Sequence, residues 1–171
     1  LLTAPLPDDE GDPGKEPQPW NHGCLLPVRV ILRDFAARGL PDVGHAATAN
    51  HLWLFIAKEL EDAALGKYAD PLYQELQENG GLLLLDGLDE VPEANRRREQ
   101  IRQVVENFIR SFPKCRVLLT SRTYAYQQQD WRIPGMAEPV LAPFSAGQIR
   151  RFVDRWYAYV AALGRTADRE D

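Results

Sequence analysis

The chain has 171 residues, of which 44% are hydrophobic, and a net charge of −5 at pH 7. This size and apolar content suffice for one sizeable core, so we expect a single folded domain. The negative charge argues against a bulk attraction to nucleic acid or anionic membrane, and no apolar run is long enough to span a bilayer, so we expect neither as a direct partner.

The N-terminal part of the chain predicts an irregular segment followed by a strand. Residues 3–23 contain five prolines, three glycines and a cluster of acids, a composition that disfavours regular structure, so residues 1–23 are expected to form a loop. The next run, residues 26–35, begins with β-branched residues and becomes helix-prone at Asp34. We interpret it as a sheet strand without chemistry that opens into a short helix.

Three further helices are expected between residues 48 and 113. The helical pattern starts at Thr48, and Asp70 with Pro71 suits the N-cap and first residue of a second helix that Gly80 ends. The third helix carries an apolar stripe and ends before Pro113. The basic run at its start, residues 96–98, is expected to be a solvated face. The stripe consists of Ile101, Val104, Val105, Phe108 and Ile109.

The stretch from Gly81 to Glu90 is an apolar run that ends in three acidic residues. Its four consecutive leucines suit a strand buried on both faces of a parallel sheet, and ligands collect at the carboxyl ends of such strands. Asp86 is therefore placed where Mg²⁺ would take an oxygen ligand, directly or through water. Asp89 or Glu90 can then orient or deprotonate the attacking water in phosphoryl transfer. The alternative is an acidic turn that is merely solvated or caps a helix.

A second short apolar strand starts at Cys115 and ends in Thr120, Ser121 and Arg122. If the two strands are parallel, this polar end emerges at the same edge as Asp86. An arginine there can neutralise charge on a terminal phosphate, because its planar fork suits phosphate oxygens. The alternative role for Arg122 is a surface salt bridge.

The C-terminal part predicts a short strand near residues 139–142 and one last helix. Ser145 and Gln148 form a capping-box pattern at the start of this helix. Its aromatic stripe is interpreted as a core face and not as a cofactor-binding surface. Residues 164–171 form a polar tail.

The two cysteines, Cys24 and Cys115, offer neither a disulfide framework nor a metal-ligand spacing. Both lie at the starts of predicted strands. We expect both to be reduced, and since the N-terminus shows no signal-peptide pattern, the expected location is the cytoplasm.

The order of these pieces resembles the NACHT family of signal-transduction nucleoside triphosphatases, over about residues 24 to 160. The most specific element is the Walker B form LLLLDGLDE, and the next is the TSR ending of the following strand. The matching segments are LLPVRVILRDF, GGLLLLDGLDEVP, CRVLLTSRTYAY and LAPFSAGQIRRFVDRWY.

The resemblance implies an α/β fold, namely a parallel-sheet P-loop nucleoside triphosphatase domain of the ASCE type, built as a three-layer sandwich over residues 24–163. It implies that Asp86 serves Mg²⁺ and that Asp89 and Glu90 belong to the hydrolytic acidic cluster. Arg122, beside Ser121, would be the sensor arginine that binds the terminal phosphate of ATP or GTP. The parent protein would be a slow ATPase or GTPase.

The chain departs from the family pattern because it lacks a Walker A loop, Gly-x-x-x-x-Gly-Lys-[Ser/Thr]. The nearest stretch, residues 11–16, has glycines too close together and no preceding strand. We therefore expect the Walker A strand and helix to precede Leu1 and further helical parts to follow Asp171, with this fragment inactive alone. Exposed strand edges invite pairing, so self-association is expected unless the missing segment covers them.

Two functions are compatible with these residues. In the first, the parent is a nucleotide-driven switch of a larger signalling or defence protein. In the second, the domain is a catalytically inactive scaffold for interaction or oligomerisation. The intact set of Asp86, Asp89, Glu90 and Arg122 favours the first, because a scaffold has no physical need for a metal-ready acidic cluster.

Overall fold

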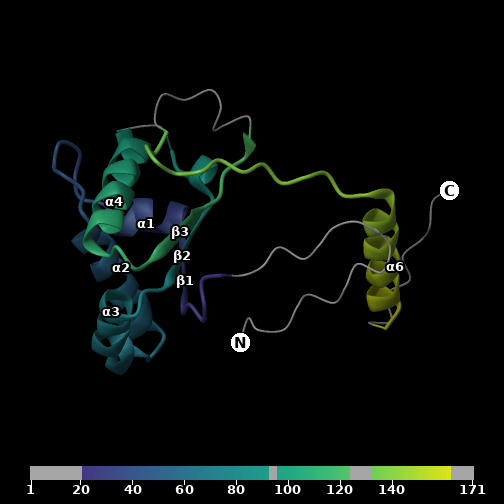
Figure 1. Ribbon diagram of the computed structural model, residues 1–171, viewed down its shortest axis with the longest axis horizontal. Coiled ribbons are helices and arrows are strands. Elements are labelled where there is room, and N and C mark those ends of the chain that lie inside the picture. Colours follow the sequence, from purple (N-terminus) through teal and green to yellow (C-terminus); the bar gives the residue numbers. More distant parts are fainter. Residues whose placement is uncertain (1–20, 93–95, 124–131, 163–171) are drawn as a thin grey trace. The chain divides into compact units, whose positions relative to one another are not determined.

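The protein is described by a computed structural model that covers residues 21–92, 96–123 and 132–162 (Figure 1). The described residues up to Ala137 belong to one unit, and those from Glu138 onward belong to a second. The loop expected before residue 21 and the tail expected at residues 164–171 lie outside the described residues.

Three parallel strands form the sheet of the first unit, in the order β1-β2-β3. The strands are β1 (Pro27–Ile31), β2 (Leu82–Asp86) and β3 (Arg116–Leu119). In their register Val30 pairs with Leu85, and Leu85 pairs with Leu119. The carboxyl ends of all three strands therefore lie at one edge, which confirms the α/β class and the parallel sheet predicted from the apolar runs.

The helices of the first unit lie on one side of this sheet (Figure 1). The path from β1 to β2 contains α1 (Leu32–Arg38), α2 (Ala49–Asp62), the 3₁₀ turn η1 (Gly66–Tyr68) and α3 (Ala69–Glu78). The path from β2 to β3 contains the 3₁₀ turn η2 (Leu88–Glu90) and α4 (Arg97–Ser111). Both crossovers advance in the same direction along the sheet, and right-handed crossovers then place their helices on the same face.

The core lies between this helical layer and one face of the sheet. Val30, Leu83 and Leu85 are at most 2% exposed, whereas Leu84 is half-buried and Leu118 is exposed. The prediction that the four-leucine strand is buried on both faces is therefore wrong for the described residues. They supply the sheet and one helical layer of the expected three-layer sandwich, so only alternate leucines are enclosed.

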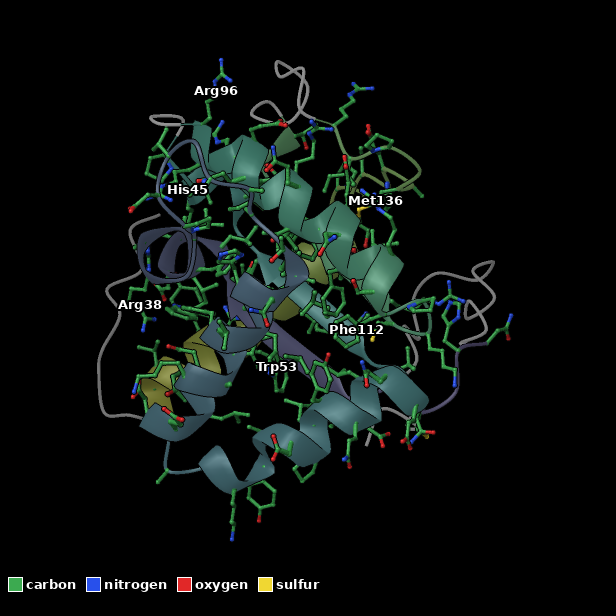
Figure 2. All side chains as sticks on the ribbon, turned by 90° about the vertical axis from the view of Figure 1, so that its left-hand side faces the viewer. Arg38, His45, Trp53, Arg96, Phe112 and Met136 are labelled. Atoms are coloured by element: carbon green, nitrogen blue, oxygen red, sulfur yellow. The ribbon has the colours of Figure 1, made fainter. Side chains whose placement is uncertain are left out.

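A chain of aromatic rings fastens α2, α3 and the end of α4 to one another. Tyr73 of α3 makes edge contacts with Trp53 at 4.8 Å and with Phe112 at 5.6 Å between ring centroids. Phe112 in turn stacks on Phe108 at 4.5 Å. Figure 2 looks onto this helical layer and labels Trp53 and Phe112. Such ring pairs add to the hydrophobic gain of burial and fix the relative positions of the helices.

One predicted helix start and one predicted strand differ from the structure. The helix expected to begin at Asp70 and Pro71 begins at Ala69, with Tyr68 at the N-cap, so Pro71 lies in the first turn. Proline is tolerated there because the first-turn N–H groups have no partner within the helix. The strand expected at residues 139–142 is absent from the described structure, and Val140 and Leu141 are exposed. A strand requires a hydrogen-bonding neighbour, and the described residues provide none at this position.

The basic run at residues 96–98 was expected to be solvated, but two of its arginines bind backbone carbonyl groups. Arg97 Nη1 donates to the carbonyl oxygen of Pro41 at 2.7 Å. Arg98 Nε donates to that of Val91 at 2.8 Å. These hydrogen bonds attach the start of α4 to two loops, so the run has a structural role.

The second unit contributes one described helix, α6 (Ala146–Ala162). Its predicted capping box is confirmed, because Ser145 N donates to Gln148 Oε1 at 2.8 Å and Gln148 N donates to Ser145 Oγ at 3.3 Å. No residue of α6 is buried, so within the described structure its aromatic stripe is not a core face. The described helices include none that is both long and apolar enough to cross a membrane.

The turn between α3 and β2 yields a stability prediction. Gly80 has a φ of +86°, and a Cβ there would overlap the carbonyl group of Lys114. Gly44 has a φ of +92° with no atom near the corresponding position. We expect Gly44→Ala to cost about 1 kcal/mol of unfolding free energy through backbone strain, and Gly80→Ala to cost about 2 kcal/mol more through the overlap. Urea denaturation of both variants checks this, and equal losses would contradict it.

The two cysteines are free and yield a reactivity prediction. Cys24 is exposed, whereas burial raises the pKa of the half-buried Cys115 thiol, whose Sγ donates to the carbonyl oxygen of Leu76 at 3.3 Å. Since the thiolate is the reactive form, Cys115 should react with DTNB more slowly than Cys24 at pH 8. The Cys24→Ser variant should lose the fast phase of the reaction. If Cys115→Ser loses it instead, the assignment is wrong.

Candidate functional site

The acidic loop, residues 86–90, begins with the last residue of β2, Asp86, at the carboxyl edge of the sheet. The chain turns at Gly87, whose φ of +81° is a left-handed conformation that favours glycine. The η2 turn then brings Asp89 and Glu90 back beside the end of the strand. Three carboxylates are thus presented within five residues.

Thr120, the residue after β3, makes three hydrogen bonds to this loop and a fourth to Leu85 of β2. Its backbone N–H donates to Leu85 O at 2.9 Å, and its carbonyl oxygen accepts from Leu88 N at 3.0 Å. Its Oγ1 accepts from Gly87 N at 3.0 Å and donates to Asp86 Oδ1 at 2.8 Å. The structure therefore brings the end of β3 against the acidic loop, as expected if the strands are parallel.

Asp86 makes the shortest side-chain contacts of the three carboxylates. Its Oδ2 forms a 2.6 Å ion pair with Arg29 Nη2, and its side chain is 43% exposed. The hydrogen bond from Arg29, followed by that from Thr120, holds the pKa of the Asp86 carboxyl below its ordinary value. Asp86 is consequently an ionised, accessible oxygen ligand at neutral pH.

Asp89 is the least accessible of the three carboxylates, with a side chain 13% exposed. Its Oδ1 accepts from Arg122 N at 3.2 Å, and its Oδ2 pairs with Arg122 Nε at 3.2 Å. Its carbonyl oxygen accepts from Arg98 Nη2 at 3.2 Å. Asp89 is therefore an anchor for the chain after β3. Arg122 forms the salt bridge that was its alternative predicted role.

Glu90 is the most open of the three, with a side chain 47% exposed. Its Oε2 lies 3.2 Å from Nη1 of Arg33, a half-exposed contact that solvent screens. Spacing in the sequence could not separate Asp89 from Glu90. The structure distinguishes them, since Asp89 is fastened to the segment after β3, whereas Glu90 is half-exposed and pairs with Arg33.

Four residues that contact the acidic loop had no predicted role there, namely Arg29, Arg33, Arg98 and Thr120. Arg29 was placed in a strand without chemistry, yet its register partner is Leu84, two residues before Asp86 on the same face of the sheet. That alternation is the only signal that could have found it. Ser121 directly follows Thr120, but its Oγ donates to the carbonyl oxygen of Arg122 at 3.4 Å and not to a carboxylate.

The donor chemistry of Asp86 and Thr120 fits a magnesium ion. Mg²⁺ in phosphate-binding sites commonly takes one or two protein oxygens and completes its shell with water and phosphate. The described residues contain no cluster of three His, Cys, Asp or Glu side chains that could hold a metal ion alone. Asp86 and Thr120 would supply part of the oxygen shell of such an ion.

The anchoring role of Asp89 yields a stability prediction. Removing its carboxylate in Asp89→Ala leaves Arg122 N without its acceptor, which we expect to cost about 1–2 kcal/mol of unfolding free energy. The control is Glu59→Ala, which removes a 48%-exposed partner of Arg38 on another part of the surface. This variant should lose about 0.5 kcal/mol or less. Urea denaturation compares the two, and a loss for Asp89→Ala no larger than the control would refute the anchor.

Comparison with known proteins agrees with this geometry. The family model for the NACHT domain matches residues 17–159, which is most of the chain. No curated protein and no solved structure gives a significant match. With its parallel sheet, its acidic loop after the central strand and this match, the chain belongs to the NACHT domain family.

Proposed function

We propose that the acidic loop and the end of β3 form the magnesium-binding and hydrolytic half of an ATP- or GTP-binding switch domain. NACHT domains bind nucleotide, generally with Mg²⁺, and occur in signalling and defence proteins. The observation that carries the proposal is the attachment of the loop to Thr120, which joins Asp86 to the segment containing Arg122.

Asp86 and Thr120 are the proposed ligands of Mg²⁺, directly or through water. Both present hard oxygens at the carboxyl edge, 2.8 Å apart. The bound ion would neutralise charge on the phosphates during phosphoryl transfer. Asp86 is suited to this role because its charge is maintained at neutral pH and its side chain is accessible.

Glu90 is the proposed carboxylate that orients or deprotonates the attacking water. It is accessible, its single ion pair is weak, and it follows the proposed metal ligand by one turn. Asp89, the other catalytic candidate, has its carboxylate engaged by Arg122. Its proposed part in hydrolysis is to position that arginine.

Arg122 is the proposed sensor of the terminal phosphate, with Ser121 beside it. Its side chain is 70% exposed and its backbone is held by Asp89, so the guanidinium is anchored at its base and accessible at its tip. A guanidinium that leaves Asp89 for a phosphate would transmit nucleotide state to the chain after β3.

A scaffold that does not hydrolyse nucleotide is the second candidate, and one observation favours it. Each carboxylate of the acidic loop has an arginine partner, so the loop is electrostatically satisfied without metal or nucleotide. In that case the domain would act by interaction or oligomerisation alone. The proposed location is the cytoplasm in either case.

The deciding experiment measures single-turnover hydrolysis of Mg²⁺–ATP and Mg²⁺–GTP by the full-length protein. We expect Glu90→Gln to lower the rate about 100-fold or more, with nucleotide binding retained, because the amide cannot accept a proton. The matched control is Glu59→Gln, which neutralises an equally exposed, arginine-paired carboxylate away from the loop. Equal rates for Glu90→Gln and the control would remove the catalytic role and favour the scaffold.

A further inference from the structure

The two accessible carboxylates of the acidic loop are paired with arginines of one short segment. Arg29, on β1, contacts Asp86 at 2.6 Å, and Arg33, in the first turn of α1, contacts Glu90 at 3.2 Å. We call residues 29–33 the β1–α1 junction. The junction therefore holds the proposed metal ligand and the proposed catalytic carboxylate at the same time, whereas Asp89 is held from β3.

These contacts balance the charge of the loop. Three carboxylates lie within five residues, at 86, 89 and 90, and three guanidinium groups face them from residues 29, 33 and 122. Without counter-ions, carboxylates this close would repel one another and favour protonation. The arginine partners offset this repulsion.

A divalent cation and the Arg29 guanidinium compete for the Asp86 carboxylate. Asp86 has two carboxylate oxygens, and Thr120 occupies Oδ1 while Arg29 occupies Oδ2. A cation that binds Asp86 must replace one of these partners or share its oxygen. Arg29 is the partner that can leave, because its side chain is 63% exposed and carries a like charge to the cation.

We propose that Arg29 and Arg33 are positioning residues that act as built-in counter-ions, occupying Asp86 and Glu90 until a divalent cation displaces Arg29. This inference rests on the proposed metal role of Asp86. Each carboxylate of the resting loop then has a guanidinium partner, and binding of the cation releases Arg29 from the loop while Arg33 keeps its contact with Glu90. The exchange is energetically easy because an exposed ion pair contributes little free energy.

The test measures binding of Mn²⁺, by electron paramagnetic resonance of the free ion, to the chain at low salt without nucleotide. Arg29→Gln should bind Mn²⁺ about two- to fivefold more tightly than the wild type, the range that an exposed ion pair supports. Arg29→Lys, which keeps the charge, should remain within about twofold of the wild type. Circular dichroism confirms that each variant is folded.

The matched control is Arg116→Gln. Arg116 lies on β3 in register with Leu82, on the same face of the sheet as Arg29, and makes no ion pair with the acidic loop in the described structure. The Arg116→Gln variant removes one positive charge without removing a counter-ion of the acidic loop. A gain in Mn²⁺ affinity equal to that of Arg29→Gln would overturn the proposal, because the effect would then be general charge.

The Asp86→Asn variant separates failure of this inference from failure of the proposed function. If Asp86→Asn weakens Mn²⁺ binding but Arg29→Gln does not strengthen it, the counter-ion role is wrong and the metal role stands. If Asp86→Asn leaves Mn²⁺ binding unchanged, the metal role of Asp86 is wrong, and the counter-ion inference fails with it. If neither the wild type nor Arg29→Gln binds Mn²⁺, the counter-ion inference is overturned, because loss of Arg29 then creates no cation site at Asp86, and the hydrolysis experiment on the full-length protein tests the proposed function separately.

Discussion

The hydrogen bonds of Thr120 are the constraint on which the candidate site depends. One residue uses its backbone N–H, its carbonyl oxygen and its hydroxyl to hold Leu85, Leu88, Gly87 and Asp86. These bonds fix where the chain leaves β2 and where it leaves β3. The carboxylates and Arg122 are neighbours because the parallel strands β2 and β3 end side by side. The Thr120 side chain, just after β3, bonds to the residues at the end of β2.

The one-sided sheet follows from the direction of the two crossovers. Since both advance from β1 toward β3, right-handed connections place α1 to α4 on the same face. The buried residues Val30, Leu83 and Leu85 face those helices, and Leu118 on the other face is exposed. Among the described residues of the first unit, no helix covers the face that carries Arg29, and its ion pair with Asp86 is exposed there. The same topology that builds the core therefore leaves the carboxylate accessible to solvent and ions.

Charge balance links this accessibility to stability. An acidic loop with three ionised groups would disfavour the folded turn, but guanidinium groups from β1, α1 and the chain after β3 compensate it. Two of the three pairs are well exposed and contribute little to stability. In the third pair the Asp89 carboxylate is mostly enclosed, although Arg122 is exposed, and it anchors the chain after β3. The loop thus combines one fixed carboxylate with two that can exchange partners, an arrangement suited to a switch.

The sequence by itself determined the parallel α/β class, the three strands, the order of helices, the capping box at Ser145 and the family, because apolar runs, turn residues and an acidic motif are local signals. Only the tertiary structure decided which face of β2 is buried, since that depends on the side to which the helices cross. It also decided that Asp89 is an anchor and Glu90 is accessible, which equal spacing could not reveal. The partners Arg29 and Arg33 lie 57 residues before Asp86 and Glu90, and no local pattern encodes a contact over that separation. Strand register and the packing of α1 create it.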